Sequence, residues 1–133
     1  MESVPAEYAD LLERESIAHF STIMPDGTPQ VTPVWIDADD DGYILVNTVR
    51  SRQKAENVSE NPKVGLSITD PDDPYRYVSI RGEVEELTTE GAVEHIDSLA
   101  QRYMDREEYP YHDDEDSSRV IVRIRPDRVI TGQ

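Results

Sequence analysis

The sequence predicts a mainly β protein, an antiparallel barrel with helices packed on its outside. Three observations support this fold class. Seven short segments are rich in β-branched and aromatic residues, turn residues separate most of them, and one long segment has helical periodicity. The 133 residues suffice for one domain, residues 1–133, with a single core.

The expected elements follow from the spacing of apolar residues and from turn signals such as Pro25-Asp26-Gly27. In chain order we expect a short helix over 6–15, strands over 17–23, 30–36 and 43–47, a helix over 51–60, strands over 63–69 and 76–87, a long helix over 89–104, and strands over 119–125 and 129–131. An acidic turn over 37–42 and an irregular acidic loop over 105–118 complete the chain.

Two residues mark expected irregularities in the strands. Pro33 has no N–H to donate, so its strand lies at a sheet edge or bulges there. Gly82 is expected at a bulge. The residues expected to face the core are Tyr8, Leu11, Leu12, Val64, Leu66, Ile68, Val78, Ile80, Val84, Val93, Ile96, Leu99, Ala100 and Tyr103.

The chain is strongly acidic, with 29 Asp and Glu against 13 Lys and Arg and a formal net charge of −16. Lys54 and Lys63 are its only lysines. This composition favours a salt-adapted surface and a halophilic origin, because molar salt screens the self-repulsion that destabilises a highly charged protein. An acidic protein without salt adaptation is the alternative. The charge argues against nucleic acid and against an anionic membrane as partners.

The absence of cysteine excludes disulfides, thiol catalysis and Cys-ligated zinc, and suits a reducing compartment. No apolar run approaches the roughly 18 residues of a membrane span. We therefore expect a cytoplasmic protein.

A cationic segment interrupts this acidic chain. Arg50, Arg52 and Lys54 fall at the start of the expected helix, where Ser51 is the expected N-cap. Cations are unfavourable at a helix N-terminus, which carries partial positive charge, so a bound anion such as phosphate would explain them. The alternative interpretation is a solvated basic turn.

Several other kinds of site lack support. His19, His95 and His112 do not have metal-ligand spacing, so no metal site is expected. The acidic run 113–116 is typical of a solvated face rather than of a calcium loop. Neither a nucleophile elbow, nor a P-loop, nor a dinucleotide-binding glycine motif occurs.

The remaining combination is an interrupted strand at 33–35, a polar strand end at Asn47 and Thr48, and the cationic helix start. Trp35 either stacks on a flat ligand or packs in the core. Since no general acid or base is evident, the pattern favours a protein that positions a redox cofactor and leaves the chemistry to it.

Five segments together are similar to the pyridoxamine 5′-phosphate oxidase superfamily, and within it to the small deazaflavin-dependent branch that uses coenzyme F-420. They are TPQVTPVW at 28–35, SRQKAENV at 51–58, NPKV at 61–64, DPDDPYRY at 70–77 and RGEV at 81–84. The resemblance implies a Greek-key split barrel of the FMN-binding type, with one long and two short helices outside. It also implies a homodimer that holds its cofactor between two identical subunits.

Transferred residue by residue, the resemblance implies a set of cofactor contacts. Arg52 and Lys54 would bind the cofactor phosphate, with Arg50 nearby. Asn47 and Thr48 would contact the ring or the polyol chain. The residues implied to line the tricyclic ring are Gln30, Thr32, Pro33, Val34 and Trp35, and those implied to come from the partner subunit are Tyr75 and Tyr77.

The function that this resemblance implies is an oxidoreductase that transfers a hydride between F-420 and a small unsaturated organic substrate. An FMN-dependent oxidoreductase of the pyridoxamine-phosphate-oxidase type is the first alternative, because one phosphate clamp serves either cofactor. A non-catalytic flavin or deazaflavin carrier is the second.

Overall fold

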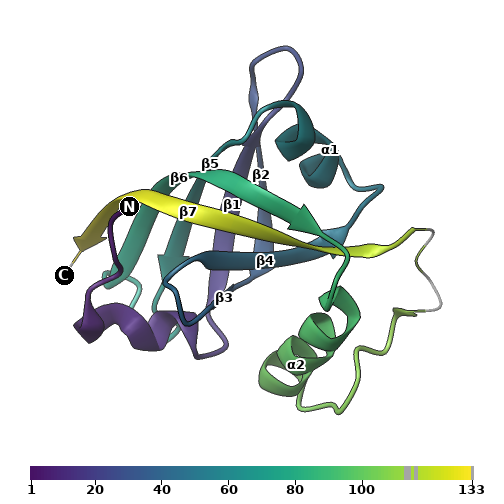
Figure 1. The fold of residues 1–133 in the computed structure, drawn as a ribbon. Coiled ribbons are helices and arrows are strands. Elements are labelled where there is room, and N and C mark those ends of the chain that lie inside the picture. Colours follow the sequence, from purple (N-terminus) through teal and green to yellow (C-terminus); the bar gives the residue numbers. More distant parts are fainter. Residues whose placement is uncertain (113–114, 116, 133) are drawn as a thin grey trace.

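Seven strands form one antiparallel sheet, and three helices lie outside it, in the computed structural model, which describes residues 1–112, 115 and 117–132 (Figure 1). The strands are β1 (Ile17–Ile23), β2 (Pro29–Trp35), β3 (Asp37–Ala38), β4 (Ile44–Val49), β5 (Lys63–Thr69), β6 (Tyr77–Thr88) and β7 (Arg119–Gly132). The helices are the 3-10 helix η1 (Ala6–Leu12), α1 (Gln53–Glu60) and the longer α2 (Ala92–Met104).

The strand order is β2-β1-β5-β6-β7-β4-β3. Strands β5, β6 and β7 are consecutive neighbours, and β4 lies beside β7, which is a Greek-key arrangement. The two edge strands, β2 and β3, are separated in the chain only by Ile36, so the chain itself closes the curled sheet. The predicted mainly β, antiparallel split-barrel fold with one long and two short helices is therefore confirmed.

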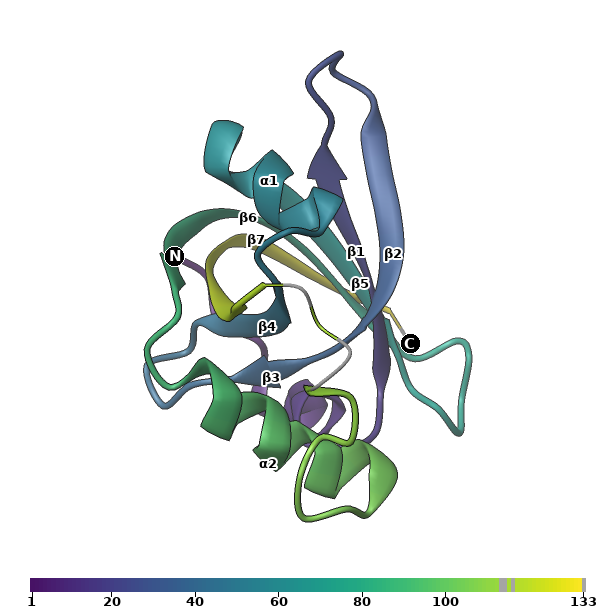
Figure 2. The same ribbon diagram turned by 90° about the vertical axis from the view of Figure 1, so that its right-hand side faces the viewer.

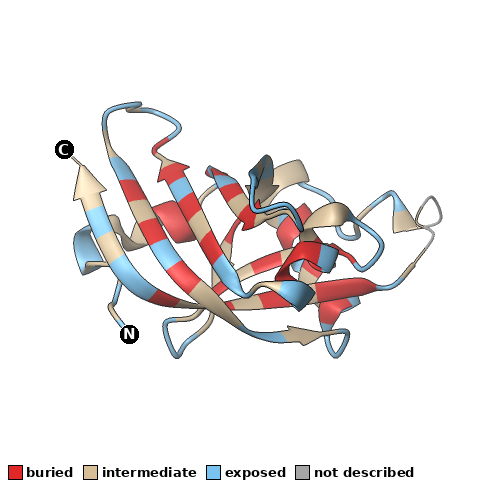
Figure 3. Cartoon of the chain, turned by 90° about the horizontal axis from the view of Figure 1, so that it is seen from above, coloured by how far each residue is buried: buried red, intermediate tan, exposed pale blue. Residues whose placement is uncertain are grey.

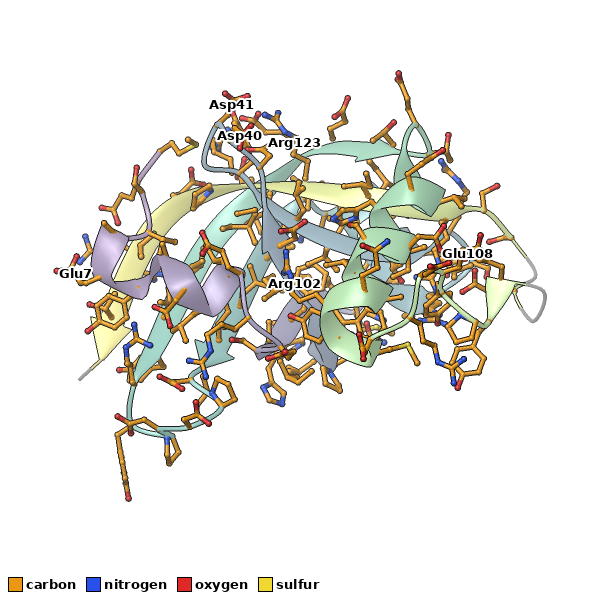
Figure 4. The ribbon with its side chains drawn as sticks, turned by 90° about the horizontal axis from the view of Figure 1, so that it is seen from below. Glu7, Asp40, Asp41, Arg102, Glu108 and Arg123 are labelled. Atoms are coloured by element: carbon orange, nitrogen blue, oxygen red, sulfur yellow. The ribbon has the colours of Figure 1, made fainter. Side chains whose placement is uncertain are left out.

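The end of α2 supplies hydrogen bonds at this closure. The Ile36 N–H donates to the Tyr103 hydroxyl over 3.1 Å, and Arg102 Nη1 donates to the Ile36 carbonyl over 2.8 Å. Arg102 reaches from α2 toward the strands (Figure 4). Ile36 is fully buried, so these bonds satisfy backbone groups that would otherwise lack partners.

The expected strand irregularities are confirmed. Pro33 lies on the edge strand β2, opposite His19. The register of β6 against β7 shifts between Arg81 and Gly82. A Cβ on Gly82 would lie 2.1 Å from the Arg125 carbonyl oxygen, so the close approach of the two strands requires glycine.

Three expected elements differ in the structure. Strand β7 is continuous where a break was expected at Pro126, because Pro126 pairs with Gly82 at the bulge and the ladder does not require its N–H there. The expected turn over 37–42 contains the short strand β3, which pairs with β4. The first helix is a 3-10 helix that ends at Leu12.

The start of α1 also differs from the expectation. Arg52, with extended backbone angles, is the N-cap, and the prediction for Ser51 was wrong. The backbone N–H of Ser51 donates to Ser117 Oγ over 3.0 Å, so this residue belongs to the turn before the helix. Two of the three cations, Arg52 and Lys54, therefore lie in the cap and the first turn.

The core fills the barrel interior, and buried and exposed residues alternate along the strands (Figure 3). Phe20, Ile44 and Ile124 are among its largest fully buried side chains. The predicted core positions on the strands and on η1 are buried or pack against the core. On α2 the expectation for Val93 was wrong: it is 49% exposed, and its neighbour Ala92 is buried instead.

Ion pairs cluster on the surface around the barrel. At the turn before β4, Arg123 pairs with Asp39 over 3.0 Å and with Asp41 over 3.7 Å, as Figure 4 shows for Arg123 and the acidic turn. Among the described residues, no helix is long and apolar enough to cross a membrane.

Candidate functional site

An open cavity of about 320 Å³ lies where β2, β4, α1, α2 and the loop after α2 meet. In Figure 2, α1 lies above β4 and α2 below it. The lining residues are Ile17, Pro33, Val34, Trp35, Asn47, Thr48, Arg52, Lys54, Ile96, Tyr109 and Arg119.

Two cations at the start of α1 form one wall. Arg52 and Lys54 have no carboxylate within ion-pair distance in the part of the chain that the structure describes, whereas Arg14, Arg76 and Arg125 each pair with several. Burial lowers the pKa of Lys54, and the charges of Arg52 and Arg119 lower it further. Cations without a carboxylate partner beside a helix N-terminus, in a chain of net charge −16, are the arrangement that favours a bound anion.

A buried hydroxyl lies on the same wall. Thr48 is 1% exposed, and its Oγ1 has no hydrogen-bond partner among the described residues. A buried hydroxyl without a partner costs free energy, so a polar ligand group that reaches Thr48 would relieve this cost.

The opposite wall is aromatic and apolar. Trp35 stacks on Tyr103 with ring centroids 4.9 Å apart, and the Tyr109 ring meets it edge-on at 6.0 Å. Tyr109 comes from the loop after α2, where its N–H donates to Asp97 over 2.8 Å. One face of Trp35 packs on Tyr103 and the residue also lines the cavity, while its stacking on a ligand stays a prediction.

A polar network lies behind the cavity. Asn47 Nδ2 is 3.0 Å from His95 Nδ1, and His95 Nε2 is 3.0 Å from Asp37. Arg102 donates to the other oxygen of Asp37 over 2.9 Å, and Arg119 Nη1 donates to Asn47 Oδ1 over 3.3 Å. Burial acts to raise the pKa of Asp37, but the hydrogen bonds from His95 and Arg102 outweigh it and hold this pKa below its ordinary value.

Seven of the twelve sequence-predicted contact residues line the cavity together: Pro33, Val34, Trp35, Asn47, Thr48, Arg52 and Lys54. Their roles toward a cofactor stay predictions.

The other five predicted residues are not in the cavity wall. Gln30 is in hydrogen-bond contact with Thr22, over 3.4 Å, and Thr32 lies between Gln30 and the cavity along β2. Arg50 is exposed at the end of β4. Tyr75 and Tyr77 are 75% and 37% exposed, near the start of β6.

Four cavity residues were not predicted from the sequence: Ile17, Ile96, Tyr109 and Arg119. Nor was the link between His95 and Asp37. No local signal in the sequence marks these residues. Ile17 reaches the cavity through the pairing of β1 with β2, and the other three through the placement of α2, the loop after it, and the register of β7 against β4. Over residues 1–112, 115 and 117–132, no group of three potential metal ligands occurs, and most of the acidic run 113–116 lies outside these residues.

The fold and the cavity define a split-barrel protein with a cavity lined by cations and aromatic rings. The sequence pattern of the pyridoxamine 5′-phosphate oxidase family matches residues 4–131. The chain therefore belongs to this family of flavin-binding oxidoreductases. A comparison with curated proteins finds no match.

Solved structures show similarity over nearly the whole chain. An F420 reductase is 37% identical with a TM-score of 0.83, over 96% of this chain and 98% of that one. A conserved hypothetical protein from Mycobacterium tuberculosis is 29% identical with a TM-score of 0.75, over 100% of this chain and 86% of that one. The general stress protein 26 of Bacillus anthracis shares the fold at 18% identity with a TM-score of 0.69, over 95% and 91% of the two chains.

Proposed function

We propose that this protein is an oxidoreductase that transfers a hydride between coenzyme F-420 and a small unsaturated organic substrate. The observation that carries the proposal is the pair Arg52 and Lys54, cations without carboxylate partners among the described residues, on the wall of the cavity. Family membership and the 37% identity with an F420 reductase support it.

The cavity fits a planar cofactor with a phosphate-bearing tail. Arg52 and Lys54 would bind the phosphate, with Arg50 nearby, and the Thr48 hydroxyl would bond a polar group next to it. Val34, Trp35 and the edge of β2 would lie along the ring. When bound, the cofactor supplies the hydride; the protein's share is to bind and orient the reactants and to exclude water.

FMN is the second candidate cofactor. The family is named for pyridoxamine 5′-phosphate oxidase, and a cationic clamp at a helix start recognises the phosphate of either cofactor. A carrier without turnover of its own would use the same clamp, so binding and turnover need separate measurements.

We also propose that the protein is a homodimer with the cofactor at the interface. None of the outward-facing residues of β1, β2 and β5, or of β6 as far as Arg81, is Asp or Glu, although the chain has 29 acidic residues. Val31, 58% exposed, and Ile17, 41% exposed, lie on this face. We call the outward-facing residues of β1, β2 and β5, which include Lys63, the carboxylate-free face.

A second copy is the partner that suits this face. Ile17 and Pro33 belong both to the carboxylate-free face and to the cavity wall, so a subunit packed there would also cover the cavity. In such a dimer we expect Tyr75 and Tyr77 to contribute to the partner's cavity. The proposal further includes a salt-adapted, haloarchaeal and cytoplasmic protein, supported by the net charge of −16 and the two lysines.

The deciding experiment is a titration of the purified protein, in high salt, with F-420 and with FMN, followed by quenching of cofactor fluorescence. Tight binding of F-420 but not of FMN supports the leading proposal, and the reverse supports the second. If neither binds, the proposal of an enzyme with either cofactor fails.

Variants locate the binding site. Arg52→Ala and Lys54→Ala should each weaken binding about tenfold, because each loses a charge-assisted hydrogen bond to phosphate. Arg106→Ala is the matched control, since it removes one exposed cation outside the cavity. An unchanged affinity in both clamp variants would contradict the phosphate assignment.

A further inference from the structure

Asn47 makes two donor contacts that define its orientation. Its Nδ2 lies 2.9 Å from the Ala92 carbonyl oxygen and 3.0 Å from His95 Nδ1. The carbonyl can only accept, so Nδ2 is the amide nitrogen and its second hydrogen points to His95. Nδ1 is then the unprotonated ring nitrogen, and Nε2–H donates to Asp37 over 3.0 Å.

The other side of the amide faces the cavity. Asn47 Oδ1 accepts from Arg119 Nη1 over 3.3 Å, and the Arg119 guanidinium also pairs with Glu115. Arg119 is 6% exposed, lines the cavity, and is close enough to Lys54 for its charge to lower the pKa of that amine. The amide therefore joins the partly buried pair His95 and Asp37 to a charged group of the cavity wall.

We propose that Asp37 and His95 are positioning residues that, together with the Ala92 carbonyl, hold the Asn47 amide in one orientation. This orientation, together with Glu115 and the Tyr109 ring 4.6 Å from the guanidinium, keeps Arg119 in the cavity wall beside Lys54. A flipped amide would turn its NH₂ group against the guanidinium and its oxygen against the Ala92 carbonyl. The acceptor at His95 Nδ1 disfavours that flip. The statement that Arg119 contributes to cofactor binding rests on the proposed function. The orientation of the Asn47 amide does not depend on it.

The two side chains are placed for this role. The His95 side chain is 10% exposed and that of Asp37 is 20% exposed, and Arg102 bonds the second Asp37 oxygen. One Asp37 carboxylate oxygen thus accepts from Arg102, and the other accepts from His95 Nε2. Because both ring nitrogens are engaged, the ring has one tautomer and one direction.

Two substitutions of His95 test the hydrogen bonds of its two ring nitrogens separately. In His95→Asn the side-chain oxygen takes the place of Nδ1 and keeps an acceptor for Asn47, but the bond to Asp37 is lost. In His95→Gln the amide nitrogen takes the place of Nε2 and keeps the donor to Asp37, but the acceptor for Asn47 is lost. The unfolding midpoint of each variant measures the purely structural cost.

The first readout needs no ligand. Long-range ¹H–¹⁵N correlation spectra of the ligand-free protein should show His95 protonated at Nε2 and unprotonated at Nδ1. The Arg119 side-chain N–H resonances should stay sharp in His95→Asn and broaden in His95→Gln. Protonation at Nδ1, or sharp Arg119 resonances in His95→Gln, would overturn the proposal.

The second readout is cofactor affinity. We expect His95→Gln to weaken binding of F-420, or of FMN if that is the cofactor, about tenfold, and His95→Asn to bind close to wild type. Equal losses that follow the drop in unfolding midpoint would mean a structural role alone. If the wild type binds neither cofactor, the proposed function fails, while the spectra still decide the orientation of Asn47.

Discussion

The hydroxyl of Tyr103 lies 3.1 Å from the backbone nitrogen of Ile36 and also donates to the carbonyl of Ser16. These two backbone groups belong to the segments just after β2 and just before β1. One side chain from α2 thus joins two ends of neighbouring strands at the point where the barrel closes. Its ring also stacks on Trp35, so the same residue supports the cavity wall.

Tyr103→Phe should destabilise the protein by about 1–3 kcal/mol, because it leaves the buried Ile36 N–H and the Ser16 carbonyl without the hydroxyl. The stacking on Trp35 stays, since the ring is kept. Urea unfolding measures the change. Tyr75→Phe is the control: Tyr75 is 75% exposed, and its variant should unfold like the wild type. Equal midpoints for Tyr103→Phe and wild type would contradict this role.

Gly82→Ala should cost about 1–3 kcal/mol or more of unfolding free energy, because the new methyl group would meet the Arg125 carbonyl oxygen at 2.1 Å and the two paired strands would have to separate. Gly65→Ala is the matched control, since the nearest atom to its new Cβ is 3.8 Å away. Thermal unfolding of both variants tests this. A loss as large for Gly65→Ala would show that the bulge is not the cause.

Asp37→Asn should destabilise the protein near neutral pH by about 1–3 kcal/mol, since it removes charged acceptors from His95 and Arg102. The folded protein holds the pKa of Asp37 below its ordinary 3.8. Its contribution is therefore complete above that value and is lost as the pH falls through the folded-state pKa.

The difference in unfolding free energy between wild type and Asp37→Asn should accordingly shrink on acidification below about pH 4. Denaturant unfolding at a series of pH values measures it. Asp40→Asn, at an exposed position without an ion pair among the described residues, is the control and should match the wild type near neutral pH. A difference that grows toward acid pH would contradict the lowered pKa.

Val31→Asp should dissociate the proposed dimer, because it places an unpaired carboxylate in the proposed contact, at a side chain that is 58% exposed in the single subunit. Val93→Asp introduces the same charge at a valine of α2 that is 49% exposed and lies away from the carboxylate-free face. Light scattering coupled to size exclusion should give a monomer for the first variant and a dimer for the second. A monomeric wild type, or a dimeric Val31→Asp, would contradict the proposed interface.

The unfolding midpoint should rise between low salt and molar KCl. The Debye length falls from about 10 Å at 0.1 M to about 3 Å at 1 M, which screens repulsion within a chain of net charge −16. Replacing exposed Glu107 and Glu108 by Gln should reduce the salt dependence slightly. A midpoint independent of KCl would argue against salt adaptation.

The sequence predicts those parts of the fold that depend on local chemistry. Strand β5 was found because Val64, Leu66 and Ile68 alternate, and the irregularities at Pro33 and Gly82 follow from a missing N–H and a missing side chain. The continuity of β7 through Pro126 was missed, because it depends on a bulge in β6 that is distant in the chain.

In the cavity, too, some residues have a local signal in the sequence and others do not. Arg52 and Lys54 stand out in the sequence because their charge opposes that of the whole chain. His95, Tyr109 and Arg119 carry no such signal: they meet Asn47 or Trp35 only after α2 and β7 have packed. Ser51 was mistaken for the helix cap because its residue type is the commoner one at that position, whereas Arg52 occupies it.

Only Ile36 separates β2 from β3, so we do not expect the protein to tolerate an insertion at this position. One residue inserted beside Ile36 would move every side chain of β3 to the opposite side and break the contacts with α2. The tip of the β1–β2 hairpin differs, because Gly27 has open space around it and a backbone angle φ of 90°. A fluorophore or peptide graft therefore belongs at that tip.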